Sequence, residues 1–389
     1  MSEIIIKCLT PRTAVQIKPS LSNAQAVELV GRLYGLKVSE VQPMPSLLGP
    51  ELPFVLVHET QGSGDHMKSY VLKVMNAADS QDADLVEAQT QVMMFLNQKG
   101  FPSSTPIPTT DGKIMSLETI KQGNDYKQYM VRLLTYLPGI PLAKFTLDHR
   151  IYYELGRTVA QMDKMLHEEF RHPTMKSLHR DKFIWNLSNT NLLERYLHEM
   201  EEGETLMIIK QVIQQFKEKI RPNLHKFRQG FIHGDCNDYN ILLQSVDLSA
   251  DQTVEKAEKT SPELTLRISG ILDFGDMSYG CFVYELAITI SYLMIDRQDP
   301  LSVGGHVIAG FESVIPLREE ERGAVFLLVL CRFCQMLVMA RHNVLLQPEN
   351  EDYLTISSRN GWRCLQQLWR VGKEAAERIW FDVVKSYQQ

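Results

Sequence analysis

The sequence predicts a mixed α+β protein with two lobes, a small β-rich lobe at the N-terminus and a large helical lobe at the C-terminus. Strand-like runs dominate up to residue 137, and helical spacing of apolar residues dominates beyond it. Pro138, Gly139 and Pro141 interrupt the pattern between the two parts. A chain of 389 residues also exceeds the roughly 150 residues of a typical domain. We therefore predict an N-terminal lobe over residues 1–137 and a C-terminal lobe over residues 138–389.

Composition excludes several classes of protein. Apolar residues make up 44% of the chain and charged residues 23%, which is typical of a soluble globular protein. The net charge of −6 leaves no bulk basic surface for nucleic acid. The most apolar run, residues 324–340, contains Arg332 and Gln335 and is shorter than the roughly 20 residues of a membrane span. We expect neither nucleic acid nor membrane as a partner, and the sequence does not indicate the oligomeric state.

Cysteine usage indicates a reducing compartment. The six cysteines are sparse and their spacing does not suggest a disulfide framework. Cys331 and Cys334 form a C-x-x-C pair inside the apolar run, and no second pair of cysteines or histidines supplies the other ligands of a zinc site. We expect two buried thiols there, in a protein located in the cytoplasm.

The first lobe reads as two helices and four strands. A capping box of Ser22 and Gln25 opens the first helix, and a glycine-containing turn at residues 61–65 predicts a hairpin. The predicted helices cover residues 22–36 and 82–98, and the predicted strands cover residues 53–58, 69–75, 113–120 and 128–137. In the second lobe, helical spacing covers residues 151–166 and 206–227, and short apolar strands cover residues 231–232, 241–243 and 264–272.

Two polar segments bounded by these short strands carry the chemistry. In residues 233–240, Asp235 is followed five positions later by Asn240, and Asp273 follows the strand that ends at residue 272. Phosphoryl transfer needs a carboxylate that accepts the substrate proton and oxygen ligands that hold Mg²⁺. Each residue alone could simply cap a turn. Together and in this order, they favour a kinase-type site.

A second segment fits the same spacing. Residues 179–186 match the protein-kinase pattern H-R-D-x-x-x-x-N letter for letter, with Asp181 in the position of the base. This segment lacks flanking apolar strands and lies 92 residues before Asp273 by 273 − 181, whereas Asp235 lies 38 before it. We interpret it as a connection between helices, with Arg180 in solvent and Trp185 lining the substrate cleft.

The first lobe offers candidates for nucleotide binding. Lys73 stands among apolar residues of a strand, and Glu87 follows on the next helix, as in the ion pair that orients nucleotide phosphates in kinases. The alternative for Lys73 is an ordinary solvated residue. A phosphate-covering loop should lie near residues 46–51, where Gly49 is the one glycine. Gly49 either lets the backbone approach phosphate or belongs to an ordinary turn.

The loop of Asp235 and Asn240, with Gly234 rather than arginine after His233, and the run Asp273 to Asp276 resemble the aminoglycoside phosphotransferase and choline kinase family. This resemblance implies a protein-kinase-like fold and a small-molecule kinase. It implies Asp235 as catalytic base, Asn240 and Asp273 as magnesium ligands, and Lys73 and Glu87 as phosphate clamp. It further suggests that Glu285 braces the catalytic loop. The alternative is that Glu285 faces solvent on an amphipathic helix.

Residues 132–139, 179–187 and 271–280 resemble one branch of this family, whose members use GTP to phosphorylate the side-chain hydroxyl of 5-hydroxy-L-lysine in lysine breakdown. The choice between GTP and ATP depends on the hinge, where Leu134 and Tyr136 are the candidate nucleotide contacts. An ammonium-bearing substrate favours acidic and aromatic walls. The candidates for these walls are Asp238, Asp276 and Trp185.

Other readings of the site remain open. The acceptor could be another small hydroxylated amine, of the choline, homoserine or aminoglycoside type. The chain could also be an inactive scaffold that kept the fold, although every chemical position is filled. A protein kinase is disfavoured, because no A-P-E segment follows Asp273.

Overall fold

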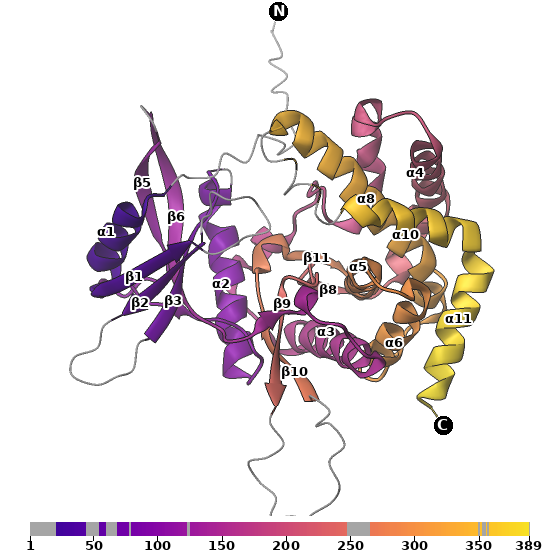
Figure 1. Cartoon of the computed structure of the whole chain (residues 1–389), viewed down its shortest axis with the longest axis horizontal. Helices are drawn as coiled ribbons and strands as arrows, with labels where there is room; N and C mark the ends of the chain where they lie inside the picture. Colours follow the sequence, from indigo (N-terminus) through magenta and orange to yellow (C-terminus); the bar gives the residue numbers. More distant parts are fainter. Residues whose placement is uncertain are drawn as a thin grey trace, which may run out of the picture.

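The computed structural model describes residues 21–43, 54–59, 68–77, 79–122, 125–246, 265–348, 351, 355 and 358–388. The predicted hairpin turn at residues 61–65 and the loop that carries Gly49 lie outside this range. Two lobes stand side by side, with the strands of the first lobe at one end and the helices of the second at the other (Figure 1). The predicted α+β, two-lobed class is confirmed.

An antiparallel sheet forms the body of the first lobe. Its strand order is β1-β2-β3-β6-β4, and β5 pairs with the far part of β6. The strands are β1 (Val38–Pro43), β2 (Phe54–Glu59), β3 (Lys68–Val74), β4 (Pro106–Ile107), β5 (Ser116–Gln122) and β6 (Asp125–Thr135). Side chains alternate between the two faces of a strand. The hairpin predicted from the turn signal is confirmed, because β2 and β3 pair antiparallel in register.

Two helices cover opposite faces of this sheet. Helix α1 (Asn23–Tyr34) packs on the face that carries Leu72 and Val74, and its predicted capping box of Ser22 and Gln25 is confirmed. Helix α2 (Ala83–Gln98) packs on the other face, between the sheet and the second lobe (Figure 1). The two neighbouring cations Lys73 and Arg132, which pair across β3 and β6, therefore lie on the side of α2.

The second lobe places two small sheets against a set of helices. Strands β7 (Ile140–Pro141), β9 (Ile241–Val246) and β10 (Thr265–Ile271) form one sheet, and β8 (Gln229–Ile232) pairs with β11 (Ser278–Cys281). The α-helices are α3 (His149–Glu169), α4 (Glu204–Gln215), α5 (Phe282–Met294), α6 (Pro300–Glu312), α7 (Glu319–Arg322), α8 (Val325–Leu346), α10 (Ser358–Val371) and α11 (Lys373–Ser386). Tighter 3-10 segments cover Asp79–Gln81, Leu142–Lys144, Pro173–Leu178, Leu187–Glu199, Arg221–Lys226 and Phe274–Asp276. The predicted boundary between residues 137 and 138 falls in the connection from β6 to β7 and stays a prediction.

One predicted helix is wrong in its extent. Residues 206–227 form α4, then a π-helical turn at Phe216–Ile220, then the 3-10 segment Arg221–Lys226. Pro222 stands at the start of that last segment, where its missing N–H cannot continue the α-helical hydrogen bonds. Apolar spacing continues through the break, because the first two parts bury side chains in one core and Leu224 of the last part packs against that core.

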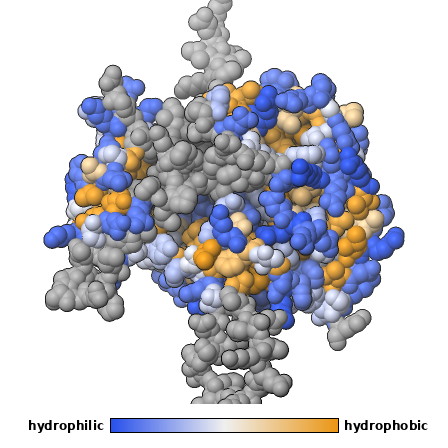
Figure 2. Space-filling model, in the orientation of Figure 1, coloured by the Kyte–Doolittle hydropathy of each residue, from blue (hydrophilic) through white to orange (hydrophobic). Residues whose placement is uncertain are grey.

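Helix α8 is longer than the apolar run suggested. It has the length and apolarity of a membrane span over Val325–Leu346, yet 89% of its most apolar window is buried inside the protein. Cys331 and Cys334 are both buried, unbridged thiols within it, as predicted. Figure 2 shows hydrophilic residues over much of this lobe's outer face. Helix α8 therefore serves as a core helix, whatever its composition resembles.

Candidate active site

A rigid frame holds the catalytic loop, residues 233–240, between β8 and β9. His233 donates from Nε2 to the carbonyl of Leu272 at 2.9 Å, and its Nδ1 accepts the N–H of Asp235 at 3.2 Å. The N–H of Leu272 donates in turn to the carbonyl of Asn240 at 2.8 Å. Leu272 directly precedes Asp273, so these bonds fix the two chemical segments against each other.

The backbone conformation at residue 234 explains why glycine follows the histidine in this loop. Its φ of +79° lies in the left-handed region that favours glycine, and a Cβ there would meet the Asp276 carbonyl oxygen at 2.9 Å. Its N–H donates to Glu285 Oε2 at 2.9 Å, from the first turn of α5. The predicted bracing of the loop by Glu285 is confirmed.

The carboxylate of Asp235 is held by three donors. Its Oδ2 accepts Nδ2 of Asn237 at 2.9 Å and Nδ2 of Asn240 at 3.0 Å, and its Oδ1 accepts the guanidinium of Arg332 at 3.1 Å. Burial raises the pKa of Asp235 to about 7, Asp276 adds to this rise, and Arg332 opposes it. A carboxylate fixed in place with a pKa near neutrality suits a general base.

Asp273 and Asn240 each carry an oxygen that could bind a cation. Asp273 has a left-handed backbone, with φ of 53°, and its Oδ1 accepts Lys73 Nζ at 2.6 Å and Gly275 N–H at 3.1 Å. Burial opposes ionisation of Asp273, but Lys73 outweighs it and holds the pKa of that carboxyl below its usual range. Asn240 turns its Nδ2 toward Asp235, which leaves Oδ1 as the atom for a metal. Two hard oxygen donors fit Mg²⁺.

The predicted ion pair of Lys73 with Glu87 is not formed. Lys73 is buried, which lowers its pKa, and it pairs with Asp273 instead. Among the residues that the structure describes, Glu87 forms no ion pair. The two buried polar side chains on α2 are Thr90, which accepts from Arg132 at 2.6 Å, and Gln89, which donates to the Gly275 carbonyl at 2.9 Å. Positions 87 and 89 point to opposite sides of a helix because they stand about 200° apart.

The hinge places the other nucleotide candidates. Leu134 is buried at the end of β6, and Tyr136 is 37% exposed with its N–H donating to Ser69 at 3.3 Å. Gly139 has a φ of +147°, and a Cβ there would lie 2.4 Å from Ser269 Oγ. The hinge therefore packs directly on β10 of the second lobe. The roles of Leu134 and Tyr136 stay predictions.

The three substrate candidates lie in two places. Asp276 interacts electrostatically with Asp235, and burial raises its pKa despite Arg180 and Arg332. The ring of Trp185 stacks on the guanidinium of Arg332, with 5.0 Å between the ring centre and the guanidinium carbon. Trp185 therefore contacts the arginine that binds Asp235. Asp238 instead lines a cavity to which neither Asp276 nor Trp185 contributes.

The competing segment, residues 179–186, supports the site without forming it. Asp181 is exposed and contacts neither Asp235 nor Asp273. Arg180 is not in solvent as predicted: it stacks on Phe183 and donates to the carbonyls of Gly275 and Met277 at 2.9 and 3.3 Å. Two backbone carbonyls of the segment that follows Asp273 thus accept from one terminal nitrogen of this guanidinium.

Arg332 is the main residue that sequence reasoning missed. It is fully buried on α8 and also donates to Tyr292 Oη at 3.0 Å and to the Trp185 carbonyl at 3.2 Å. Its signal was visible, because a buried cation in an apolar helix needs partners inside the protein. The sequence could not show that the partner is Asp235, 97 residues away.

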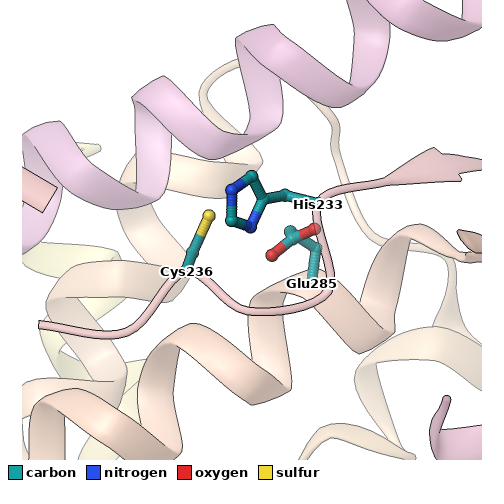
Figure 3. Close-up of side chains that lie close together, drawn as sticks. All are labelled: His233, Cys236 and Glu285. Atoms are coloured by element: carbon teal, nitrogen blue, oxygen red, sulfur yellow. The ribbon is translucent and has the colours of Figure 1, made fainter. Parts of the chain in front are cut away.

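A cluster of metal-ligand types lies beneath the loop. The ligand atoms of His233, Cys236 and Glu285 fall within 4.8 Å of one another, and all three residues are buried (Figure 3). Both nitrogens of His233 and one oxygen of Glu285 already make the hydrogen bonds described above. The cluster is explained by its role in holding the loop.

The comparisons with known proteins agree with this geometry. Residues 54–251 match the model of the phosphotransferase enzyme family, which covers about half of the chain. The chain belongs to this family. Full-length relatives extend the match: hydroxylysine kinase of Bos taurus is 46% identical over 95% of both chains, and that of Mus musculus is 47% identical over the same shares. The chain is accordingly a kinase that transfers a phosphoryl group to a hydroxyl.

Solved structures show the fold. An aminopropanol kinase associated with a microcompartment superposes with a TM-score of 0.63 at 13% identity, over 92% of this chain and all of that one. An amicoumacin kinase gives a TM-score of 0.60 at 15% identity, over 90% and 94%. The predicted protein-kinase-like fold is therefore confirmed.

Proposed function

We propose that this phosphotransferase transfers the γ-phosphoryl of GTP to the side-chain hydroxyl of 5-hydroxy-L-lysine with the help of Mg²⁺. The likeness to hydroxylysine kinases at 46–47% identity over 95% of the chain carries the choice of substrate. The proximity of Asp273 to both Lys73 and Asp235 supports the chemistry. ATP is the alternative donor.

The residues of this chain can each be given a step. Asp235 would accept the proton of the substrate hydroxyl, because its carboxylate is oriented by Asn237, Asn240 and Arg332. Asn240 and Asp273 would hold Mg²⁺, which neutralises charge on the phosphates when it is bound. Lys73 forms an ion pair with Asp273 in this structure. Lys73 would turn to the phosphates of the nucleotide when Asp273 serves as a metal ligand.

The neighbourhood of Asp235 suits an amino alcohol. In 5-hydroxylysine the ε-ammonium stands one carbon from the hydroxyl carbon, so both groups must be met close together. Asp276 lies near enough to Asp235 to raise its pKa. Asp276 could therefore bind the ammonium while Asp235 receives the proton. Such a charged hydrogen bond contributes roughly 1.5–3 kcal/mol.

The test is direct. Purified protein is given Mg²⁺ with GTP or ATP and a panel of 5-hydroxylysine, lysine, choline, homoserine and an aminoglycoside, and phosphate transfer is followed by mass. We expect hydroxylysine to react fastest and lysine, which lacks the hydroxyl, to bind without reacting. EDTA should abolish transfer, and added Mg²⁺ should restore it.

Each part of the proposal can fail separately. Equal or faster turnover of choline, homoserine or the aminoglycoside would remove the substrate and leave the kinase. Faster turnover with ATP would replace the donor. Absence of transfer to every acceptor would favour the inactive scaffold. Full activity without metal would contradict the assignment of Asn240 and Asp273.

We place this activity in the cytoplasm, in the breakdown of lysine, with no nucleic acid or membrane partner. The five cysteines that the structure describes are all free thiols, which supports a reducing compartment. The net charge of −6 supports the expected lack of a nucleic acid partner.

A further inference from the structure

The cavity that contains Asp238 opens beside the catalytic loop. None of the residues given a chemical step above lines it. It encloses about 320 Å³, at the low end of the roughly 300–1,000 Å³ of small-molecule sites. Three segments that are distant in sequence line it: residues 143–146 after β7, Asp238 and Tyr239 of the catalytic loop, and residues 295–297 after α5. A ligand in this cavity would touch the loop that carries Asp235.

The cavity combines charges of both signs. Asp238 and Asp296 contribute two carboxylates, and Lys144 and Arg297 contribute two cations. An α-amino acid carries one carboxylate and one ammonium on the same carbon. The lining therefore complements a zwitterion, whereas a phosphate or a simple polyamine would meet charges of its own sign.

Among the described residues these four charged groups form no ion pair with one another, and Asp296 accepts a hydrogen bond from Asn360. Arg297 donates from one terminal nitrogen to the Phe145 carbonyl at 3.2 Å, but its Nε is buried without a partner. Asp238 is mostly buried and, among the residues that the structure describes, joins no ion pair. Leaving the buried Nε of Arg297 unpaired is costly unless a ligand completes it.

The distance along the chain suits the proposed substrate. Asp238 follows Asp235 by three residues, so their Cα atoms are at most roughly 11 Å apart. In 5-hydroxylysine the hydroxyl carbon stands three bonds from the α-carbon. The ε-ammonium end would remain near Asp235 and Asp276, and the α-carbon end would point away from them.

We propose that this cavity is the subsite for the α-amino acid head group, where Arg297 binds the α-carboxylate and Asp238 with Asp296 binds the α-ammonium. This inference rests on the proposed function, because it needs an amino acid as the acceptor. The two ends of the substrate would then bind in different places. Asp276 and Asp235 would bind the amino alcohol, and the cavity would bind the head group. Simple amino alcohols would then be poor substrates because they leave the cavity empty.

The experiment pairs two substrate analogues with two variants. 1,5-Diaminopentan-2-ol lacks only the α-carboxylate, and 6-amino-5-hydroxyhexanoic acid lacks only the α-amine. We expect the wild type to lose roughly ten- to a hundredfold in kcat/KM on each analogue relative to hydroxylysine. Arg297→Gln should lose a similar factor on hydroxylysine and almost nothing on diaminopentanol. Asp238→Asn should lose it on hydroxylysine and almost nothing on the hydroxyhexanoic acid.

Controls separate recognition from folding. Arg378→Gln makes the same change at an exposed arginine of α11 and should match the wild type on all three substrates. Arg297→Lys keeps the charge and should recover part of the loss on hydroxylysine. Thermal unfolding of each variant shows whether it is folded. If Arg297→Gln does not fold, the comparison of Asp238→Asn with the wild type still tests the proposal.

The outcomes distinguish the two proposals. If the wild type phosphorylates hydroxylysine but each variant loses the same factor on every substrate, the subsite is wrong and the function stands. The same holds if both variants retain wild-type kcat/KM on hydroxylysine. If the wild type does not phosphorylate hydroxylysine at all, the proposed function fails and the subsite fails with it.

Discussion

Two segments of this chain carry histidine, aspartate and asparagine at kinase spacing, and the structure uses them differently. Residues 233–240 lie between β8 and β9, each of which belongs to a sheet. Their Asp235 receives hydrogen bonds from Asn237, Asn240 and Arg332. Residues 179–186 run between two 3-10 segments, with Asp181 exposed. The letters of a motif are therefore insufficient. The strands on either side decide whether its carboxylate can be fixed in a cleft.

The largest expected effect separates the two aspartates. Asp235→Asn should lower kcat by at least about 10²-fold with folding intact, because asparagine keeps the shape and cannot accept the proton. Asp181→Asn should retain turnover close to wild type. Steady-state kinetics with both variants tests this, and the reverse ranking would assign the base to residues 179–186.

Substitution of Asn240 should affect the Mg²⁺ requirement, and substitution of Asn186 should affect stability. Asn240→Ala should raise the Mg²⁺ concentration needed for half-maximal activity by at least about tenfold. Asn186→Ala should leave that requirement unchanged but lower the free energy of unfolding by roughly 1–3 kcal/mol, because its buried Nδ2 bonds Ser278 and Tyr279. Magnesium titrations and denaturant unfolding measure the two effects. A changed Mg²⁺ requirement in Asn186→Ala would contradict the difference.

Arg332 offers a pH test of the first loop. Its positive charge favours ionised Asp235 and so lowers the pKa of that base, which burial has raised to about 7. Without this charge the pKa rises further, and the acid limb of kcat/KM should move to higher pH in Arg332→Gln. Arg332→Lys keeps a charge and should move it less. An unshifted limb in Arg332→Gln would show that the ion pair does not tune the base.

The smallest effect concerns α2. Gln89→Leu removes a hydrogen bond to Gly275, beside Asp273, and should lower kcat/KM by roughly five- to tenfold, as for a net bond of about 1 kcal/mol. Glu87→Gln should change little, because Glu87 has no ion pair among the described residues. Kinetics with GTP at varied concentration measures both. A larger loss in Glu87→Gln would restore the predicted clamp of Lys73 with Glu87.

Some of the residues that meet at the site could be foreseen from the local chain, and their chemical roles stay predictions. Asp235, Asn240 and Asp273 stand next to short strands whose apolar runs are readable, so their convergence could be predicted. Arg332 and Arg180 could not be assigned in the same way. Their partners are backbone carbonyls and a carboxylate nearly a hundred residues distant, and no local pattern records such pairings.

The sequence alone determined the two-lobed class, the first capping box, the hairpin of β2 and β3, and the strand-bounded loop that carries Asp235. These features follow from short-range periodicity and from backbone preferences, such as the need for glycine at the left-handed position 234. Only the tertiary structure decided which charges meet. Lys73 pairs with Asp273 rather than Glu87, and Arg332 meets Asp235, because burial forces each buried ion to find whichever partner the packing of distant elements supplies.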